Sequence, residues 1–224
     1  MSEFSFLATP EKGNVDAILQ RPNKTTALLV LAHGAGGDLH HRHMAALAEA
    51  FYGRNIATLR FNFPYMQQGK PRTDTPAVCI ETFKNAIATA RKKVRRLPLF
   101  IGGHSFGGRM SSHYKAETGD TRVSGLIFCS FPLHNPKKPD TTRAEHLYGV
   151  ETPMLFLSGT RDPMADLVLL KPTVKKIMHA QLHQLDTADH SYKILKRTRE
   201  SKEDVYAEAA RVAAGWISEL NEHN

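Results

Sequence analysis

The chain has 224 residues, of which 41% are hydrophobic and 23% are charged, a composition typical of a globular protein. This length fits one domain, so residues 1–224 are expected to form a single one, and no apolar stretch approaches the roughly 20 residues that cross a bilayer. The N-terminus lacks a secretory-signal pattern and the chain has only two cysteines, which predicts a cytoplasmic protein without structural disulfides.

The chain is basic, with a formal net charge of +8. Its densest run of cations, Arg91–Arg96, falls at the end of a predicted helix, where the helix dipole favours positive charge. The other basic residues are spread out and accompany neither an aromatic strip nor a zinc-finger spacing. The charge therefore indicates solubility or a mild attraction for anionic substrates, and neither a nucleic-acid nor a membrane partner is expected.

Strand-like and helix-like segments alternate along the chain. In chain order, the predicted elements are strand Val15–Gln20, strand Thr26–Ala32, helix Leu39–Tyr52, strand Ile56–Phe61, helix Ala77–Arg96, strand Leu99–Gly103, helix Gly108–Glu117, strand Val123–Cys129, a short helix Thr141–Leu147, strand Pro153–Ser158, a helical segment containing Pro172, strand Ala180–Leu185 and helix Val205–Leu220. This order predicts an α/β fold, a three-layer sandwich around a mostly parallel sheet. The gap from Ser130 to Thr152 is too short for a large cap domain.

A glycine-flanked serine follows the strand Leu99–Gly103, in the order Gly103-His104-Ser105-Phe106-Gly107. Gly-x-Ser-x-Gly after a strand and before a helix is the pattern of a nucleophile elbow, a tight turn with the serine at its tip. Glycines suit such a turn because they tolerate its backbone angles and leave room for it. Ser105 is therefore the candidate nucleophile.

A serine nucleophile needs a base to take its proton and an acid to orient that base. Asp162 follows the strand Pro153–Ser158, and His190 follows the last predicted strand. Asp162 could instead cap a helix and His190 could be an ordinary loop residue, but their order and placement favour a triad of Ser105, Asp162 and His190. Asp189 is the competing acid, although adjacent side chains on an extended loop point apart.

A glycine-rich segment, His33–Gly37, follows the strand Thr26–Ala32. Acyl transfer builds negative charge on the carbonyl oxygen, and backbone N–H groups stabilise it. We expect these donors to be the amides of Phe106 and Ala35, with Gly36 as the alternative to Ala35, and we expect His33 to fix the loop. The segment lacks the ending of a P-loop and the full dinucleotide-binding pattern, which argues against nucleotide binding.

Residues with weaker signals surround this site. Candidate substrate-binding residues are Phe63, Tyr65, Phe131, His134 and Arg72, the last together with Lys70, although ordinary loop packing explains them equally well. His40, His41 and His43 lie near a helix start but have no cysteine or acid pair beside them, so an exposed helix end is favoured over a metal site. Cys129 is expected to be a buried bystander. Neither a metal nor a cofactor is expected.

The chain resembles the α/β-hydrolase superfamily over nearly its whole length. The residues that carry the resemblance are His33-Gly34-Ala35-Gly36-Gly37, Gly103-His104-Ser105-Phe106-Gly107-Gly108, Gly159-Thr160-Arg161-Asp162 and Asp189-His190-Ser191. It looks most like the small, capless, dienelactone-hydrolase-like branch, although Ser105 stands where dienelactone hydrolase uses cysteine. The segment Arg60–Tyr65, together with Leu31–Gly37, is similar to a bacterial group related to testis-expressed protein thirty and to the third regulatory subunit of the NSL complex. The resemblance implies about seven or eight mostly parallel strands.

These observations predict a serine hydrolase that cleaves a carboxylic ester or thioester of a small-molecule acyl substrate through an acyl-enzyme on Ser105. The sequence does not distinguish this reaction from the cleavage of a peptide or a lactone on the same fold, because leaving-group preference depends on loop shape. The alternative is a weakly active or inactive hydrolase fold that serves as a protein-interaction module, as the resemblance allows. We expect a monomer or a homodimer.

Overall fold

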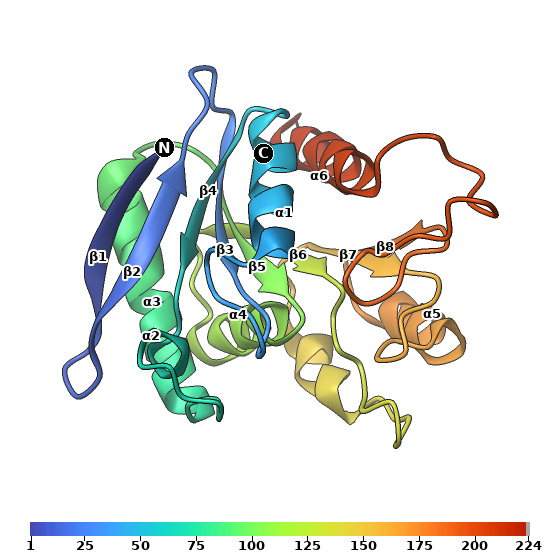
Figure 1. Cartoon of the computed structure of the whole chain (residues 1–224), viewed down its shortest axis with the longest axis horizontal. Coiled ribbons are helices and arrows are strands. Elements are labelled where there is room, and N and C mark those ends of the chain that lie inside the picture. Colours follow the sequence, from blue (N-terminus) through green and yellow to red (C-terminus); the bar gives the residue numbers. More distant parts are fainter. Residues whose placement is uncertain (223–224) are drawn as a thin grey trace.

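A computed structural model describes residues 1–222, which fold around an eight-stranded sheet with the strand order β1-β2-β4-β3-β5-β6-β7-β8 (Figure 1). β3 to β8 pair in parallel, and β2 is antiparallel to both of its neighbours. The mostly parallel sheet predicted from the alternating segments is therefore confirmed. None of the helices within these residues is long and apolar enough to cross a membrane.

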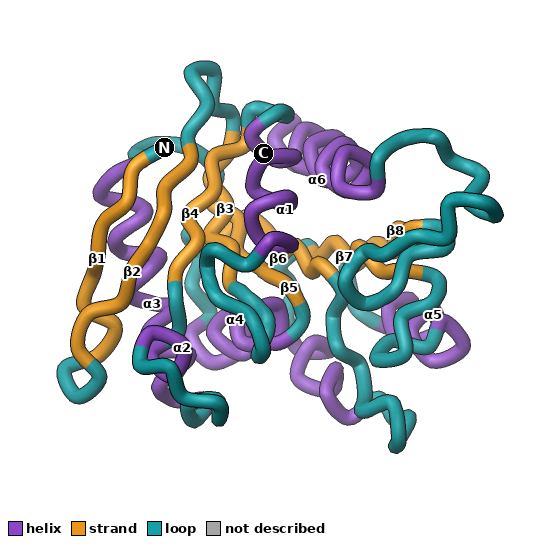
Figure 2. The backbone as a smooth tube through the Cα atoms, in the orientation of Figure 1, coloured by secondary structure: helices purple, strands orange, loops and turns teal. Residues whose placement is uncertain are grey.

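Most element bounds fall close to the predicted ones. The strands are β1 Ser2–Thr9, β2 Gly13–Gln20, β3 Ala27–Ala32, β4 Ile56–Phe61, β5 Leu99–His104, β6 Val123–Cys129, β7 Met154–Gly159 and β8 Ala180–Leu185. The helices are α1 Arg42–Tyr52, α2 Pro64–Gln67, α3 Pro76–Lys93, α4 Phe106–Thr118, the 3-10 helix η1 Thr142–Gly149, α5 Leu167–Lys176 and α6 Val205–Glu222. Loops connect these elements at both ends of the strands (Figure 2).

The structure contains two elements that were not predicted from the sequence. β1 pairs along its length with β2 and contributes Phe6 and Ala8 to the core. Its outward side chains are mostly exposed, so its apolar alternation is short and easily missed. The other is α2, a single turn that begins at Pro64, where the fixed φ of proline suits the first helical position.

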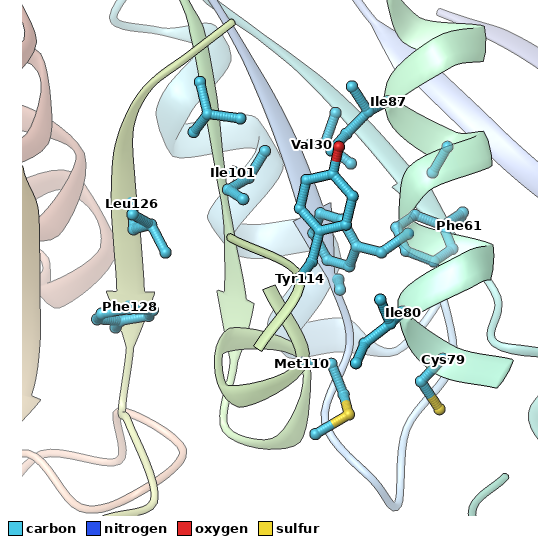
Figure 3. Packing of buried hydrophobic residues seen from close by; sticks show 14 of the residues in the cluster. Val30, Phe61, Cys79, Ile80, Ile87, Ile101, Met110, Tyr114, Leu126 and Phe128 are labelled. Carbon is cyan, nitrogen blue, oxygen red and sulfur yellow. The ribbon is translucent and has the colours of Figure 1, made fainter. Parts of the chain in front are cut away.

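Helices cover both faces of the sheet. In β3, Leu29 and Leu31 face the layer formed by α1 and α6, whereas Leu28 and Val30 face the layer with α3 and α4. This alternation follows from the two-residue period of a strand, and it explains why a central strand with two covered faces is an unbroken apolar run. Figure 3 shows the second layer, where Val30 and Ile101 from the sheet lie near Ile87 of α3 and Tyr114 of α4.

The parallel strands bring their carboxyl ends to one edge of the sheet. The loops after β3, β5, β7 and β8 begin there, and open α/β sheets bind ligands at this edge. The connection from β6 to β7 holds only the short helix η1, so no large cap domain is evident. The edge that carries the candidate residues therefore opens to a cleft that no cap covers.

Candidate active site

Ser105 lies in the sharp turn between β5 and α4, with backbone angles of φ +51° and ψ −114°. A residue other than glycine in this region carries strain of roughly 1–3 kcal/mol, which the surrounding structure must overcome. The flanking glycines allow the turn to press against the end of β3. A Cβ atom at Gly103 would lie 2.2 Å from the carbonyl oxygen of Ala32, and one at Gly107 would lie 2.3 Å from the same oxygen.

This close approach predicts that Gly107→Ala destabilises the fold by about 3 kcal/mol, the upper end for an overpacked site, because the new methyl group meets backbone atoms that cannot rotate away. The matched control is Gly215→Ala in α6, where a Cβ atom would meet nothing within 4 Å beyond its chain neighbours and the helix's own backbone, so alanine should stabilise the helix by roughly 0.5–1 kcal/mol. Urea unfolding followed by circular dichroism measures both. Equal stability of Gly107→Ala and the wild type would contradict the close contact.

Ser105, His190 and Asp162 form a continuous chain of hydrogen bonds. The Ser105 hydroxyl donates to Nε2 of His190 over 2.8 Å. Nδ1 of His190 lies 2.8 and 2.9 Å from the two carboxylate oxygens of Asp162. Since an ionised carboxylate only accepts hydrogen bonds, Nδ1 carries the proton and Nε2 presents its lone pair to the serine. This tautomer is the one that can take a proton from Ser105.

The acid next to the imidazole is Asp162 and not Asp189. Asp162 is 4% exposed, and one of its oxygens also accepts the backbone N–H of Met164 over 2.8 Å. Asp189 turns away from the ring, and its Oδ1 accepts the backbone N–H groups of Ser191 and Lys193. The structure therefore brings together the three residues that the strand ends indicated, and the competing acid serves a local turn.

His33 ties the glycine-rich loop after β3 to the body of the protein. Its side chain is fully buried, its Nε2 accepts the N–H of Phe63 over 3.0 Å, and its Nδ1 donates to the carbonyl of Gly34 over 2.8 Å. The Gly34 carbonyl also accepts the N–H of Gly37. In a trans peptide the next N–H points opposite to the carbonyl, so these bonds fix the direction of the Ala35 N–H. His33 has the structural role that the sequence predicted.

Tyr65 holds the next peptide of the same loop. Its hydroxyl donates to the Ala35 carbonyl over 2.9 Å, which fixes the direction of the Gly36 N–H by the same reasoning. Phe106 begins α4, so its N–H has no carbonyl one turn earlier within the helix to bond. Ala35, Gly36 and Ser105 line one cleft. The arrangement can therefore present amides from two loops to a carbonyl beside Ser105.

The predicted substrate contacts require correction. Phe63 and Tyr65 are fully buried and pack under the side chain of Phe106, with ring centroids 5.5 and 6.3 Å from it, so neither lines an acyl pocket. Arg72 is exposed between α2 and α3, as is Lys70, and neither lines the cleft. The apolar run around Phe63 belongs to the core because α2 folds it inward.

Phe131 and His134 are also buried, each at 2% exposure. Phe131 packs against Phe128 and Phe156, with centroid distances of 5.2 and 5.7 Å. Nε2 of His134 accepts the N–H of Asp166 over 3.1 Å. These two side chains hold the segment after β6 against the loop that carries Asp162. Phe131 and His134 therefore have the role of ordinary loop packing, the alternative to substrate binding in the sequence analysis above.

A cleft of about 350 Å³ lies beside Ser105 and His190. Its walls include five residues that sequence reasoning did not assign to it, namely His41, Met44, His104, Met164 and Ser191. The signal for His104 and Ser191 was their position next to Ser105 and His190 in the chain. Met44 and Met164 had no distinctive signal, because a methionine in an apolar pattern is more often a core residue.

His104 connects three parts of the site. Its Nε2 donates to the backbone carbonyl of His190 over 2.9 Å, and a Cβ atom at Gly34 would lie 2.8 Å from its Nδ1. Burial lowers the pKa of His104 to about 4, so the ring is neutral near pH 7. It therefore supports the backbone of His190 without placing a second cation beside that imidazole, whose ring centroid is 5.1 Å away.

Of the three histidines near the start of α1, His40 and His41 are exposed as expected, whereas the expectation is wrong for His43. His43 is 3% exposed, its Nδ1 lies 2.9 Å from the hydroxyl of Tyr206, and its ring lies 4.3 Å from that of His104. The apolar face of α1 turns His43 inward, whereas His40 and His41 are exposed. Within residues 1–222, no group of three or more His, Cys, Asp or Glu side chains is placed to hold a metal ion.

Buried neutral histidines predict a loss of stability in mild acid. Burial lowers the pKa of His33 to about 4 and that of His43 to about 2. The unfolded chain, with histidine pKa values near 6.5, binds more protons, so stability is full above about pH 6.5 and falls as the pH drops. At pH 5.5 each histidine should cost about 1 kcal/mol relative to pH 7.5.

Urea unfolding at the two pH values measures this loss. The exposed His40, replaced by asparagine, is the control and should leave the difference unchanged. A free energy of unfolding that is the same at both pH values would contradict the burial of neutral imidazoles.

The cysteines are free and buried. Burial raises the pKa of the Cys129 thiol to about 12, so it stays protonated near pH 7. Since the thiolate is the reactive form, Cys129 is a poor nucleophile despite its place at the end of β6.

A family model described as an alpha/beta hydrolase domain matches residues 25–218. Among solved structures, a dienelactone hydrolase from Anabaena variabilis superposes with a TM-score of 0.71 at 19% identity, covering 97% of both chains. Est1E from Butyrivibrio proteoclasticus, with ferulic acid bound, has a TM-score of 0.71 at 18% identity, over 93% of this chain and 96% of that one.

A serine hydrolase without a lid from Xanthomonas campestris has a TM-score of 0.68 at 17% identity, over 99% of this chain and 94% of that one. At identities this low, the likeness to solved structures establishes the fold and leaves the substrate open. The absence of a lid in that protein parallels the uncapped sheet edge described above.

Proposed function

Because this chain belongs to the alpha/beta hydrolase domain family, we propose that it is a serine hydrolase that cleaves a carboxylic ester or thioester through an acyl-enzyme on Ser105. The observation that carries the proposal is the hydrogen-bonded chain from the Ser105 hydroxyl through His190 to Asp162, with contacts of 2.8 to 2.9 Å, at the wall of an open cleft. These contacts fall within the range needed for proton transfer between a nucleophile and its base.

In the first step, Nε2 of His190 takes the proton of Ser105 while Oγ attacks the carbonyl carbon of the substrate. The carbonyl oxygen becomes an oxyanion, which the backbone amides of Phe106 and Ala35 stabilise. Asp162 stabilises the imidazolium that forms and keeps the ring oriented. These groups come from four strand ends: Ser105 and Phe106 follow β5, while Ala35, Asp162 and His190 follow β3, β7 and β8.

In the second step, the tetrahedral intermediate collapses and His190 gives its proton to the departing oxygen or sulfur. The acyl group is then bonded to Ser105. A water molecule gives a proton to His190 and attacks the acyl carbon, and a second tetrahedral intermediate releases the carboxylic acid as Ser105 regains its proton. The cycle consumes one water and leaves the enzyme unchanged.

Two further observations support an acyl substrate of modest size. The cleft of about 350 Å³ lies at the low end of typical ligand pockets, and no cap extends it. The structural neighbours include an esterase with ferulic acid bound and a dienelactone hydrolase. The specific relation to the testis-expressed and NSL-complex group stays a prediction, as do the single-domain boundary, the cytoplasmic location and the monomeric or homodimeric state.

Labelling with a biotinylated fluorophosphonate tests the proposal. The folded protein should be labelled once, and mass spectrometry of its peptides should place the phosphonyl group on Ser105. Heat-denatured protein is the control and should not react, because the activated hydroxyl depends on the assembled site. A folded protein that resists labelling and turns over neither p-nitrophenyl acetate nor an acyl thioester would contradict the proposal and favour the interaction-module alternative.

A further inference from the structure

A second hollow adjoins the cleft beside Ser105. Its volume is about 430 Å³, and it shares the residues His41 and Ser191 with that cleft. The remaining lining residues come from the start of α1, the loop after β8 and the start of α6, namely Arg42, His43, Asp189, Tyr192, Lys193 and Tyr206. The two hollows therefore meet at His41 and Ser191, both of which are exposed.

Two exposed cations line the hollow. Arg42 is the first residue of α1, and Lys193 lies on the loop that follows His190. Within residues 1–222, neither side chain forms an ion pair with a carboxylate. The first turn of α1 also carries no acidic residue. An arginine at the start of a helix opposes the helix dipole, so its position there is not explained by helix stability.

The acidic groups nearby are already engaged by backbone amides. Asp189 lines the hollow, but its Oδ1 accepts the N–H groups of Ser191 and Lys193. Asp204, whose charge acts on Tyr206, accepts the N–H groups of Tyr206 and Ala207 at the start of α6. Asp189 keeps its negative charge, so the residues that line the hollow comprise two cations, Arg42 and Lys193, against one carboxylate. This excess of positive charge is left for a ligand.

The position of the hollow indicates which part of a substrate it contacts. The departing oxygen or sulfur must lie within hydrogen-bond reach of Nε2 of His190, which protonates it. Asp189, Ser191 and Lys193, which line the hollow, flank His190 in the chain. The part of the substrate that continues beyond the departing atom therefore lies on this side of the site.

Resting on the hydrolase function proposed above, we infer that this hollow binds an anionic group, a carboxylate or a phosphate, on the alcohol or thiol that the reaction releases. Arg42 can bind such a group through two parallel N–H bonds, and Lys193 adds a point charge. Because ion pairs at an exposed site are weak, the two cations together should give a preference of roughly tenfold in kcat/KM, which added salt weakens.

A matched pair of thioesters tests the inference. S-acetyl-6-mercaptohexanoate and its carboxamide share the acyl group and the reacting bond and differ in the charge at the far end of the thiol. Thiol release is followed with Ellman's reagent at low and high salt. The carboxylate should be favoured about tenfold at low salt and less at high salt. S-acetyl-6-mercaptohexyl phosphate, run in parallel, shows which of the two anions the hollow prefers.

The variant Arg42→Gln/Lys193→Gln should bring the carboxylate-to-carboxamide ratio close to one. Lys196→Gln is the control, since Lys196 is exposed on the same loop and does not line the hollow. Equal turnover of the pair by the wild type, or a preference that survives in the double variant, would overturn the inference while leaving ester cleavage intact. If neither thioester is cleaved, the hydrolase proposal itself is contradicted.

A binding measurement keeps the inference testable without turnover. NMR titration of the Ser105→Ala protein with 6-hydroxyhexanoate and with 6-hydroxyhexanamide should show weaker binding of the neutral compound. The double cation variant should remove that difference, and its persistence there would count against the assignment of Arg42 and Lys193.

Discussion

Replacing Ser105 with alanine is expected to lower kcat by roughly 10⁴- to 10⁶-fold, because the change removes the oxygen atom that forms the acyl-enzyme in the proposed mechanism. Residual activity would come from binding and from the oxyanion donors, which are backbone amides and stay in place. Initial rates on p-nitrophenyl acetate measure the effect. A variant that retains more than a tenth of wild-type activity would contradict the assignment of Ser105 as nucleophile.

Ser105→Gly separates the chemical role from the strain at the same position. Ser105 has φ +51°, and glycine adopts such angles without steric cost. The glycine variant should be as inactive as the alanine variant, yet more stable than it by about 1 kcal/mol, which raises Tm by roughly 2–4 °C for a chain of this size. Equal melting temperatures of the two variants would argue against stored strain at the turn.

Asp162→Asn is expected to lower kcat by about 10⁴-fold. The asparagine amide can donate to Nδ1 of His190, which favours the ring tautomer with its proton on Nε2, where it can no longer accept from Ser105. The protein should remain folded, because asparagine has nearly the same shape and its oxygen can still accept the N–H of Met164. Turnover of p-nitrophenyl acetate and urea unfolding give the two readouts.

Asp189→Asn is the matched comparison for that substitution. Its Oδ1 accepts two backbone N–H groups, and the amide oxygen of asparagine can accept the same bonds, so turnover should change less than about tenfold. A larger loss in Asp189→Asn than in Asp162→Asn would reverse the assignment of the acid.

The three hydrogen-bonded residues of the candidate site could be predicted from the sequence because each of them follows a strand. Ser105 comes after β5, Asp162 after β7 and His190 after β8, and parallel strands place their carboxyl ends at one edge. Local patterns were enough to find these strands, so the three residues could be paired before any distance was known. The His33–Gly37 loop was found in the same way, because it follows a strand. The structure shows that this strand, β3, pairs with β5 and so places the loop beside Ser105.

The surroundings of the site did not follow in the same way. Phe63 and Tyr65 come after β4 just as the other candidates come after their strands, but the single turn of α2 carries both rings into the core. The sequence gives no signal for this, because an aromatic residue in a loop has the same composition whether it faces a ligand or the interior. His43 is a similar case, since only the contact between α1 and α6 places it against Tyr206.

By itself, the sequence determined the alternation of strands and helices, the turn at Ser105 and the order of Asp162 and His190 after it. These features depend on short-range physics, namely the period of apolar residues and the conformational freedom of glycine. Only the tertiary structure decided the first strand's place at the sheet edge, the separation of Asp162 from Asp189, and the hollow lined by Arg42 and Lys193. Those features arise where segments distant in sequence meet. The orientation of the side chains there is set by packing and hydrogen bonds that no local sequence pattern encodes.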